Sequence, residues 1–451
     1  MAVYSRRLKR ARSPQCPGCA RQNQKLRLYT TLDLCYIDLY RSYDPNTERK
    51  DAAVTANGLA FAQERLDRAF TPHRPIDVPE FFAGRLNLLY RANDAANTSG
   101  LHIVLFGDRG TGKTSIARVL AHRLQEPERK DGRRTIFTSC NSSDTYSSIW
   151  RRVFQEILLE QRQLGFVQQA TATVVGRLDV DDKVSDPNDV RLLVRSLPNP
   201  PVIFIDEFDR VAPESDARRL MADTIKLFAD TNVESTIVLV GVAESIDELI
   251  TEHQSIARNI AQIQVMPMTV DELSEIIQKG FERAGLACEK GLDRRIAHLS
   301  QGYPHYTHLL GLWAGRRATE AGRLEVVAAD LDHAIPDALE NASGSVRLEY
   351  ARAVASGRKD TLYKQVLLAC ALAPKDTLGR FAAIDVRSHL REITGHDYNT
   401  GAYQAHLAKF CEASRGPVLR RTGSRRNYRW QFVNPQLIPY VHLRGIEDGF
   451  L

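Results

Sequence analysis

The segment GDRGTGKTS at 107–115 constrains the fold of this chain more than any other stretch. It follows an apolar run at 103–106 and precedes a helix-like pattern at 116–124. A strand, a glycine-rich loop and a helix in that order match the phosphate-binding pattern G-x-x-x-x-G-K-[ST]. The glycines let backbone N–H groups close around phosphate oxygens, and the new helix points its positive dipole end at them. An ordinary strand-to-helix turn is the alternative interpretation.

The residue types in this loop indicate distinct chemical roles. Lys113 can reach the β- and γ-phosphates of a nucleotide, and the hydroxyl of Thr114 can ligate Mg²⁺. The residues of the loop predicted to bind the nucleotide are Gly107, Asp108, Arg109, Gly110, Thr111, Gly112, Lys113, Thr114 and Ser115.

A second motif lies about 95 residues further along, where an apolar run at 201–205 ends in Asp206 and Glu207. A continuous apolar run is typical of a strand buried on both faces of a parallel sheet. Open α/β sheets bind ligands at the carboxyl ends of their strands, which is where these two acids fall. We expect Asp206 to hold Mg²⁺ and Glu207 to orient and deprotonate the attacking water. Strands often end in polar turns, so the support comes from the pairing with the glycine loop.

The remaining patterns predict an α/β fold with a parallel sheet and two further parts. Short strands are expected at 135–138, 236–243 and 263–265. The predicted organisation is a basic, disordered N-terminal extension at 1–68, a nucleotide-binding base at 69–268, a small all-α lid at 269–345 and a separate C-terminal domain at 346–451. In that last part, helices at 362–372, 382–393 and 401–413 precede a hairpin at 418–432, the order of a winged helix.

Composition restricts the location of the chain. It has 451 residues, a net charge of +6 and no uncharged apolar run near 18 residues, so no membrane helix is expected. Seven dispersed cysteines suggest reduced thiols in the cytoplasm. Cys16 and Cys19 form half of a zinc site, and the sequence leaves open whether they bind zinc or whether the first 60 or so residues belong to the native protein.

With these motifs in place, residues 70–445 resemble AAA+ ATPases, most closely the origin-recognition/initiator-like branch. The resemblance rests on the glycine loop, on the Asp-Glu-Phe-Asp sequence at 206–209, on the small helical unit and on the C-terminal winged helix. It implies an ATP site with Mg²⁺ at the boundary between base and lid, and an activity controlled by self-assembly. It also implies an arginine just before the last core strand that reaches a neighbour's γ-phosphate, a place that Arg258 fits. An exposed helix arginine is the alternative interpretation of Arg258.

The lid motif at 302–305 departs from that branch. Initiators commonly have an arginine where this chain has His305, whereas the G-x-P form, with Pro304, is similar to signal-transducing (STAND-type) NTPases. Both residues are expected to contact the nucleotide, with His305 a weaker phosphate ligand than arginine because it is only partly charged near neutral pH. A polar residue near the γ-phosphate is also not obvious, since Glu244 or Ser245 occupies that area. We therefore expect ATP binding with slow hydrolysis.

The C-terminal domain offers basic side chains in its hairpin. The exposed face of the helix at 401–413 has no residue suited to reading bases, so duplex DNA binding is expected to be mostly non-specific and sensitive to salt. A wing that docks a protein effector is the alternative. The candidate DNA contacts are Arg420, Arg421, Arg425, Arg426 and Arg429.

Three functions remain open from the sequence. The first is an ATP-dependent assembly switch that acts on DNA. The second is a STAND-like signalling or defence NTPase whose winged helix docks a protein partner. The third is a transposition-type ATPase that selects a target.

Overall fold

The computed structural model describes residues 48–125, 133–163, 186–197, 199–243, 245–249, 256–357, 361–424 and 427–451. The chain divides into two units, 1–57 and 58–451, and the fold below is that of the second. Cys16, Cys19, Glu244, Arg425 and Arg426 lie outside the described residues, so the expectations placed on them are not addressed.

The centre of the base is a five-stranded sheet in which every pairing is parallel, in the order β2-β3-β4-β1-β5. All residues of β1 and β3 are buried, as expected for apolar strands covered on both faces. The predicted α/β fold with a parallel sheet is confirmed. The strands are β1 (His102–Gly107), β2 (Thr135–Ser139), β3 (Val202–Asp206), β4 (Thr236–Val242) and β5 (Ile260–Gln264).

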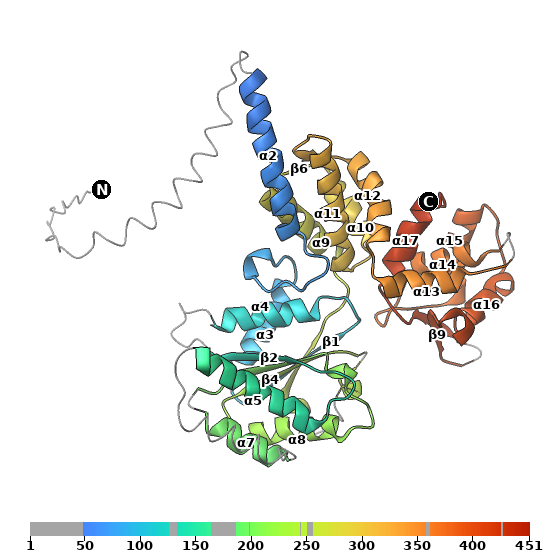
Figure 1. The fold of residues 1–451 in the computed structure, drawn as a ribbon. Helices are drawn as coiled ribbons and strands as arrows, with labels where there is room; N and C mark the ends of the chain where they lie inside the picture. The colour runs from blue at the N-terminus through green and yellow to red at the C-terminus, as the bar shows by residue number, and fades with distance from the viewer. Residues whose placement is uncertain are drawn as a thin grey trace, which may run out of the picture. The chain divides into compact units, whose positions relative to one another are not determined.

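Helices cover both faces of this sheet, and a separate buried cluster lies under each layer (Figure 1). One layer is formed by α3 (Leu86–Ala96) and α4 (Lys113–Gln125). The other is formed by α5 (Tyr146–Gln163), α7 (Pro187–Arg195) and α8 (Asp216–Asp230). Short 3-10 turns complete the base: η1 (Pro79–Phe81), η2 (Phe208–Arg210), η3 (Ile246–Glu248) and η4 (Ala257–Asn259).

A helical unit follows the sheet. Its first helix begins at a capping box, in which the Thr269 hydroxyl and the Glu272 carboxylate satisfy each other's backbone N–H groups. The unit consists of α9 (Val270–Ala284), β6 (Ala287–Cys288), α10 (Leu292–Leu299), α11 (Pro304–Glu320), β7 (Glu325–Val326) and α12 (Ala328–Glu340).

The expectation that residues 1–68 lie outside the folded part is wrong for their last third. α2 (Glu48–Ala69) is helical, and Ala62 and Leu66 are buried against the helical unit. Phe70 continues this contact, since a Cβ at Gly280 would lie 2.3 Å from its Cζ atom. The segment was misjudged because its apolar residues are few, and their partners lie more than 200 positions away.

The last part of the chain, called here the C-terminal segment (344–451), contains more elements than expected. Its three-stranded antiparallel sheet has the order β8-β10-β9. The elements are α13 (Gly344–Val354), α14 (Tyr363–Leu372), β8 (Arg380–Phe381), α15 (Ala383–Thr394), α16 (Thr400–Lys409), η5 (Ala413–Arg415), β9 (Leu419–Thr422), β10 (Arg429–Phe432) and α17 (Leu437–Glu447).

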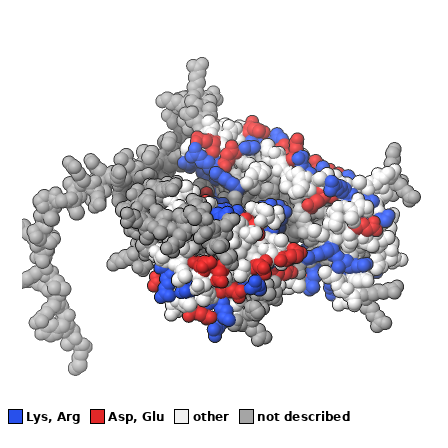
Figure 2. Space-filling model, turned by 60° about the horizontal axis from the view of Figure 1, so that its bottom comes forward, with Lys and Arg blue, Asp and Glu red and all other residues white. Residues whose placement is uncertain are grey.

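Acidic and basic side chains are interspersed over the described surface on the face drawn in Figure 2. The charge seen there does not gather into one basic field. Among the described helices, none combines the length and the hydropathy needed to cross a bilayer.

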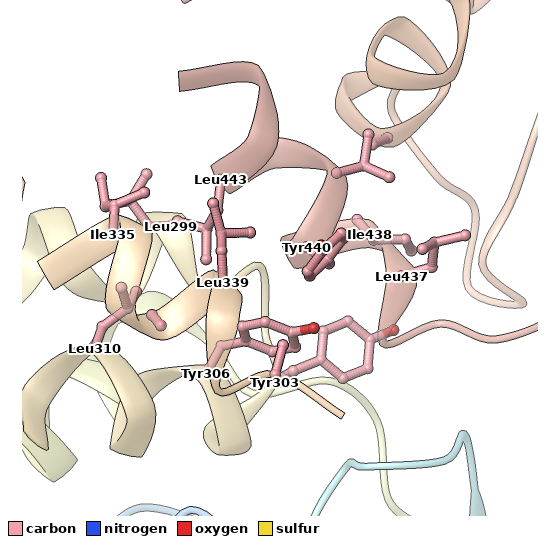
Figure 3. Packing of buried hydrophobic residues seen from close by; sticks show 14 of the residues in the cluster. Leu299, Tyr303, Tyr306, Leu310, Ile335, Leu339, Leu437, Ile438, Tyr440 and Leu443 are labelled. Carbon is pink, nitrogen blue, oxygen red and sulfur yellow. The ribbon is translucent and has the colours of Figure 1, made fainter. Parts of the chain in front are cut away.

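The sequence led us to expect a separate C-terminal domain with its own core. Among the described residues, however, the C-terminal segment shares its core with the helical unit. One continuous buried cluster runs from α2 through the helical unit into α14 and α17. Figure 3 shows Leu339 and Tyr306 of the helical unit facing Leu443 and Tyr440 of α17. The helical unit and the C-terminal segment are therefore joined through shared apolar packing.

Candidate nucleotide-binding site

The glycine loop between β1 and α4, called here the P-loop, has a shape that only glycine allows at three positions. Gly107, Gly110 and Gly112 have φ values of 143°, 81° and 90°. A Cβ at Gly107 would also lie 2.4 Å from the carbonyl oxygen of Val265. The hydroxyl of Thr111 donates to the Asp108 carbonyl oxygen at 2.9 Å, which closes the turn. The loop therefore surrounds the N-terminus of α4, the arrangement that binds phosphate.

Lys113 is already directed along this loop. It is 7% exposed, and its Nζ atom donates to the carbonyl oxygens of Gly107 (2.9 Å) and Asp108 (2.7 Å). Burial lowers the pKa of Lys113 to about 8, against the carboxylates of Asp209, Asp108 and Asp206, which raise it. The ammonium group is thus placed beside the turn, where it could bind phosphate, and no carboxylate among the described residues is bonded to it directly.

The carboxyl end of β3 brings Asp206 to the start of α4. Asp206 is 5% exposed, accepts a hydrogen bond from the Glu207 backbone N–H at 2.8 Å, and is hydrogen-bonded to the Thr114 side chain. Burial raises the pKa of Asp206, while these hydrogen bonds lower it. A carboxylate and a hydroxyl in contact are hard oxygen donors of the kind that Mg²⁺ prefers, so these residues fit the predicted metal site.

Glu207 lines the same cavity but is held in an ion pair. Its Oε2 atom lies 2.8 Å from Nη1 of Arg210, and both side chains are about half exposed. Its φ of 54° is in the left-handed region, which is uncommon outside glycine. Asp209 is fixed differently, because its Oδ1 atom accepts from the backbone N–H of Val242 at the end of β4. The ion pair with Arg210 therefore restrains Glu207 through one of its two carboxylate oxygens.

The cavity above the P-loop has a volume of about 600 Å³ and is closed on one side by the lid motif. Pro304 begins α11 and lines the cavity together with His305. Nδ1 of His305 lies 2.7 Å from the Pro72 carbonyl oxygen, in the segment that leads into the base. Burial lowers the pKa of His305, against the hydrogen bond to Pro72, which raises it. A neutral ring is therefore favoured at this position, which weakens the expectation that His305 binds phosphate as a cation.

Arg85 is a cavity residue that the sequence analysis missed. It is 7% exposed, has a φ of 54°, and bonds the Met266 carbonyl oxygen through Nη2. Its Nη1 atom is buried and has no hydrogen-bond partner among the described residues. Burial lowers the pKa of Arg85 to about 10, and its charge also lowers the pKa of Lys113. A buried, unpaired donor beside a second cation is a costly arrangement that an anion would relieve. The available signal was a charged residue directly after the run Phe-Phe-Ala-Gly at 81–84.

Arg258 lies outside this cavity. It is on η4, just before β5, with a side chain that is 73% exposed and a distance of 3.8 Å between Nη2 and Oδ1 of Asp230. It does not line the cavity of its own chain. Any contact with a nucleotide would have to be made to a neighbouring molecule.

Gln436 of the C-terminal segment packs against the P-loop. It is, after Arg85, the second cavity residue that the sequence did not indicate. A Cβ at Gly110 would lie 2.5 Å from Nε2 of Gln436, and the Gln436 carbonyl oxygen accepts from the Tyr306 hydroxyl at 3.0 Å. Gln436 also lines the cavity.

The hairpin arginines are not equivalent. Arg420 donates through Nε and Nη2 to Oε1 of Gln431 at 3.0 and 2.9 Å, and its charge acts on Asp108 of the P-loop. Arg420 and Arg421 are both exposed on β9, and the guanidinium of Arg421 lies 4.3 Å from the Tyr428 ring centre. Arg429 is half-buried in β10. Arg420 therefore faces the base, and Arg421 is the hairpin cation best placed for an external partner.

The geometry of this nucleotide-binding site agrees with the family that the chain matches. Residues 69–330, more than half of the chain, match the family model described as Novel STAND NTPase 1. No curated protein matches the chain in sequence.

Solved structures with similar folds include the Walker-type ATPase PABY2304 of Pyrococcus abyssi. Its TM-score is 0.51 at 17% identity, over 82% of this chain and 98% of that one. The ORC1 protein of Aeropyrum pernix, solved in complex with DNA, has a TM-score of 0.44 at 17% identity, over 86% and 97% of the two chains. The RuvB Holliday junction branch migration motor of Thermotoga maritima has a TM-score of 0.40 at 16% identity, over 78% and 93%. At these identities the similarity shows the fold alone, and it rests on the first structure, whose TM-score exceeds 0.5.

Proposed function

We propose that this chain, which belongs to the Novel STAND NTPase 1 family, is an ATP- and Mg²⁺-dependent switch in which the bound nucleotide sets the position of the C-terminal segment. The observation that carries the proposal is that Gln436 of that segment packs against Gly110 in the cavity that also contains Lys113. In this proposal the P-loop contacts Gln436 of the C-terminal segment in the empty protein and the phosphates of the nucleotide in the complex.

Nucleotide binding in this proposal uses groups that are already in place. The N–H groups of the P-loop and the Lys113 ammonium would hold the β- and γ-phosphates, and Nη1 of Arg85 would supply a further donor. Thr114 and Asp206 would hold Mg²⁺, which when bound neutralises charge on the phosphates. Pro304 and the segment at 71–76 would close over the rest of the nucleotide.

Hydrolysis in this proposal is slow and depends on assembly. Glu207 would orient and deprotonate water, and the ion pair with Arg210 would restrain it in this role. The exposed position of Arg258 supports a role toward the site of an adjacent subunit rather than its own. A guanidinium supplied in this way can raise a rate about 10³- to 10⁵-fold, so turnover would follow self-association.

Movement would involve the C-terminal segment and the helical unit together. They share one buried cluster, whereas the sheet has two clusters of its own. Separating Gln436 from Gly110 would therefore turn both as one body, with Pro304 still over the nucleotide, because breaking the shared cluster would expose much apolar surface. A protein effector that captures the released segment is the partner that this arrangement favours.

The test of nucleotide binding is a titration of the full chain with ATP, with and without Mg²⁺. We expect binding that Lys113→Ala abolishes, and that Asp206→Ala makes independent of Mg²⁺. Lys290→Ala, at an exposed position on the helical unit, is the matched control and should bind as the wild type does. ATP affinity that survives Lys113→Ala would refute the proposed site.

Duplex DNA is a second candidate partner, favoured by the exposed position of Arg421 on β9. Arg421→Ala should weaken DNA binding and reduce the slope of log affinity against log salt by about 1. Arg420→Ala is the comparison, since that side chain is bonded to Gln431 and faces the base. DNA binding that both variants leave unchanged would exclude the hairpin as the DNA-binding surface.

A cytoplasmic location is also part of the proposal. Cys140, Cys288, Cys370 and Cys411, the cysteines among the described residues, are all free thiols. Free thiols and an ATP site are both typical of a reducing compartment.

A further inference from the structure

Two histidines of α11, His305 and His308, line the cavity and are three residues apart, so they share one face of the helix. Both are held by neighbouring backbone groups of the same lead-in segment. The Thr71 N–H donates to Nδ1 of His308 at 3.2 Å, and Nδ1 of His305 lies 2.7 Å from the Pro72 carbonyl oxygen. The phosphate and Mg²⁺ chemistry proposed above uses neither ring.

These contacts assign opposite tautomers to the two rings. A carbonyl oxygen can only accept, so Nδ1 of His305 carries the proton and its Nε2 keeps a lone pair. A backbone N–H can only donate, so Nδ1 of His308 is unprotonated and its Nε2 carries the proton. Within the part of the chain that the structure describes, no group is hydrogen-bonded to either Nε2 atom. Of these two cavity residues, His305 therefore offers an acceptor and His308, three positions further along α11, offers a donor.

Burial keeps both rings neutral. It lowers the pKa of His308 to about 4, and it lowers the pKa of His305 below the ordinary value, with help from the nearby His73. A lone pair on Nε2 of His305 repels a phosphate oxygen, so a ligand for this atom must be a hydrogen-bond donor. The hydrogen-bonding edge of a nucleobase meets this requirement.

We propose that His305 and His308 read the base of the bound nucleotide and select adenine. This inference rests on the proposed function, in which the cavity holds a nucleotide. Nε2 of His305 accepts from the 6-amino group, and Nε2–H of His308 donates to the adjacent ring nitrogen. Adenine offers a donor at position 6 beside an acceptor on both edges that include its 6-amino group. Guanine has an acceptor at position 6, so its N7 edge offers acceptors only and its N1 edge has the donor and the acceptor in reverse order.

The cavity also has apolar walls for the faces of a purine. These side chains come from the lead-in segment, the turn before α9 and α9 itself, and they lie in the same cavity as the two rings. They are Ile76, Phe82, Met268 and Ile276.

The test compares nucleotides that differ at one atom, using the full chain. The variants are His305→Asn and His308→Asn, because an Asn side chain can replace Nδ1 in each bond to the lead-in segment and has no group at the place of Nε2. His305→Asn is expected to weaken ATP binding about three- to tenfold. It should leave unchanged the affinity for purine riboside triphosphate, which lacks the 6-amino group.

His308→Asn tests the donor in the same way. It should weaken ATP binding by a similar factor. The ring nitrogen that accepts from His308 is absent from either 1-deaza-ATP or 7-deaza-ATP, and the wild type should bind that analogue weakly. His308→Asn should bind the same analogue as the wild type does. Both variants should bind inorganic triphosphate, which has no base, as well as the wild type does. That control separates base reading from damage to the phosphate site.

Two results would overturn the inference. One is an equal loss of affinity for ATP and for purine riboside triphosphate in His305→Asn, which is the signature of a structural role. The other is equal affinity of the wild type for ATP and GTP. Nucleotide binding that Lys113→Ala abolishes would still establish the proposed site in either case, whereas a wild type that binds no nucleotide refutes both.

Discussion

The most informative single substitution is Arg85→Met, because Arg85 is buried without being fully paired. Methionine keeps an apolar stem of similar length and removes the guanidinium. In the empty protein this deletes the bond to the Met266 carbonyl oxygen, which contributes about 1.5–3 kcal/mol because its donor is charged. It also removes the buried Nη1 atom that has no partner among the described residues, whose desolvation costs about 1–3 kcal/mol. The two effects nearly cancel, so the empty variant should be about as stable as the wild type.

The effect on the nucleotide complex should be opposite in sign. A hydrogen bond between a guanidinium and a phosphate contributes about 1.5–3 kcal/mol, so Arg85→Met should weaken ATP binding about 10- to 150-fold. At an ATP concentration of 100 times the wild-type Kd, ligand stabilises the wild type by about 2.7 kcal/mol. A tenfold weaker variant retains about 1.4 kcal/mol, roughly half of the ATP-dependent shift in Tm.

The assay is thermal unfolding with and without ATP·Mg²⁺, together with a direct titration. Arg85→Lys is the matched control, since it keeps the charge but loses the planar fork, and it should fall between the wild type and Arg85→Met. A variant that unfolds at a much lower temperature when empty, yet keeps the full ATP-dependent shift, would show that Arg85 is a structural residue and refute this reasoning.

Three further predictions concern the other groups of the site. ATP affinity should decline as the pH rises above about 8, because burial lowers the pKa of Lys113 to about 8 in the empty site and only the protonated form attracts phosphate; a Kd that stays constant from about pH 7 to about pH 9.5 contradicts this. Glu207→Gln should bind ATP normally but hydrolyse it at least about 100-fold more slowly, and normal turnover in this variant would exclude Glu207 as the base. Arg210→Ala, by freeing Glu207 from its ion pair, should raise the single-turnover rate about two- to fivefold. Arg258→Ala should lower the rate only at protein concentrations at which the wild type self-associates, and a loss that is independent of concentration would argue against action on a neighbour.

The features that the sequence predicted correctly are local ones. The P-loop is specified by glycine spacing within nine residues, and its glycines do adopt the positive φ values that the pattern requires. The three central strands, β1, β3 and β4, are buried on both faces along nearly all of their length, so each is a nearly continuous apolar run that can be recognised without knowledge of its partners. Asp206 follows from its position at the end of such a run.

The features that were missed depend on contacts between distant positions. Arg85 bonds a carbonyl group 181 residues away, and nothing in its neighbours predicts a left-handed backbone there. The tautomers of His305 and His308 are set by Thr71 and Pro72, more than 230 residues earlier. The core shared by the helical unit and the C-terminal segment was missed for the same reason. α14 has apolar residues on most of its surface, and this pattern does not show whether its packing partners belong to the same domain.

The contact of Gln436 with the P-loop also joins distant positions, and no pattern marks a glutamine as a partner of a glycine loop. It is nevertheless the contact on which the proposed switch depends. The turn that carries Gln436 is held by its own backbone hydrogen bonds, from Leu437 to Asn434 and from Ile438 to Pro435. These amides provide a direct measure of whether the turn stays in place.

The central claim, that nucleotide binding at the P-loop moves the C-terminal segment, is tested most directly by amide hydrogen exchange at residues 434–440. ATP·Mg²⁺ should increase exchange there in the wild type, because release from Gly110 exposes the turn. Lys113→Ala should show no such increase. A wild type that binds ATP while exchange at 434–440 stays unchanged would contradict the account.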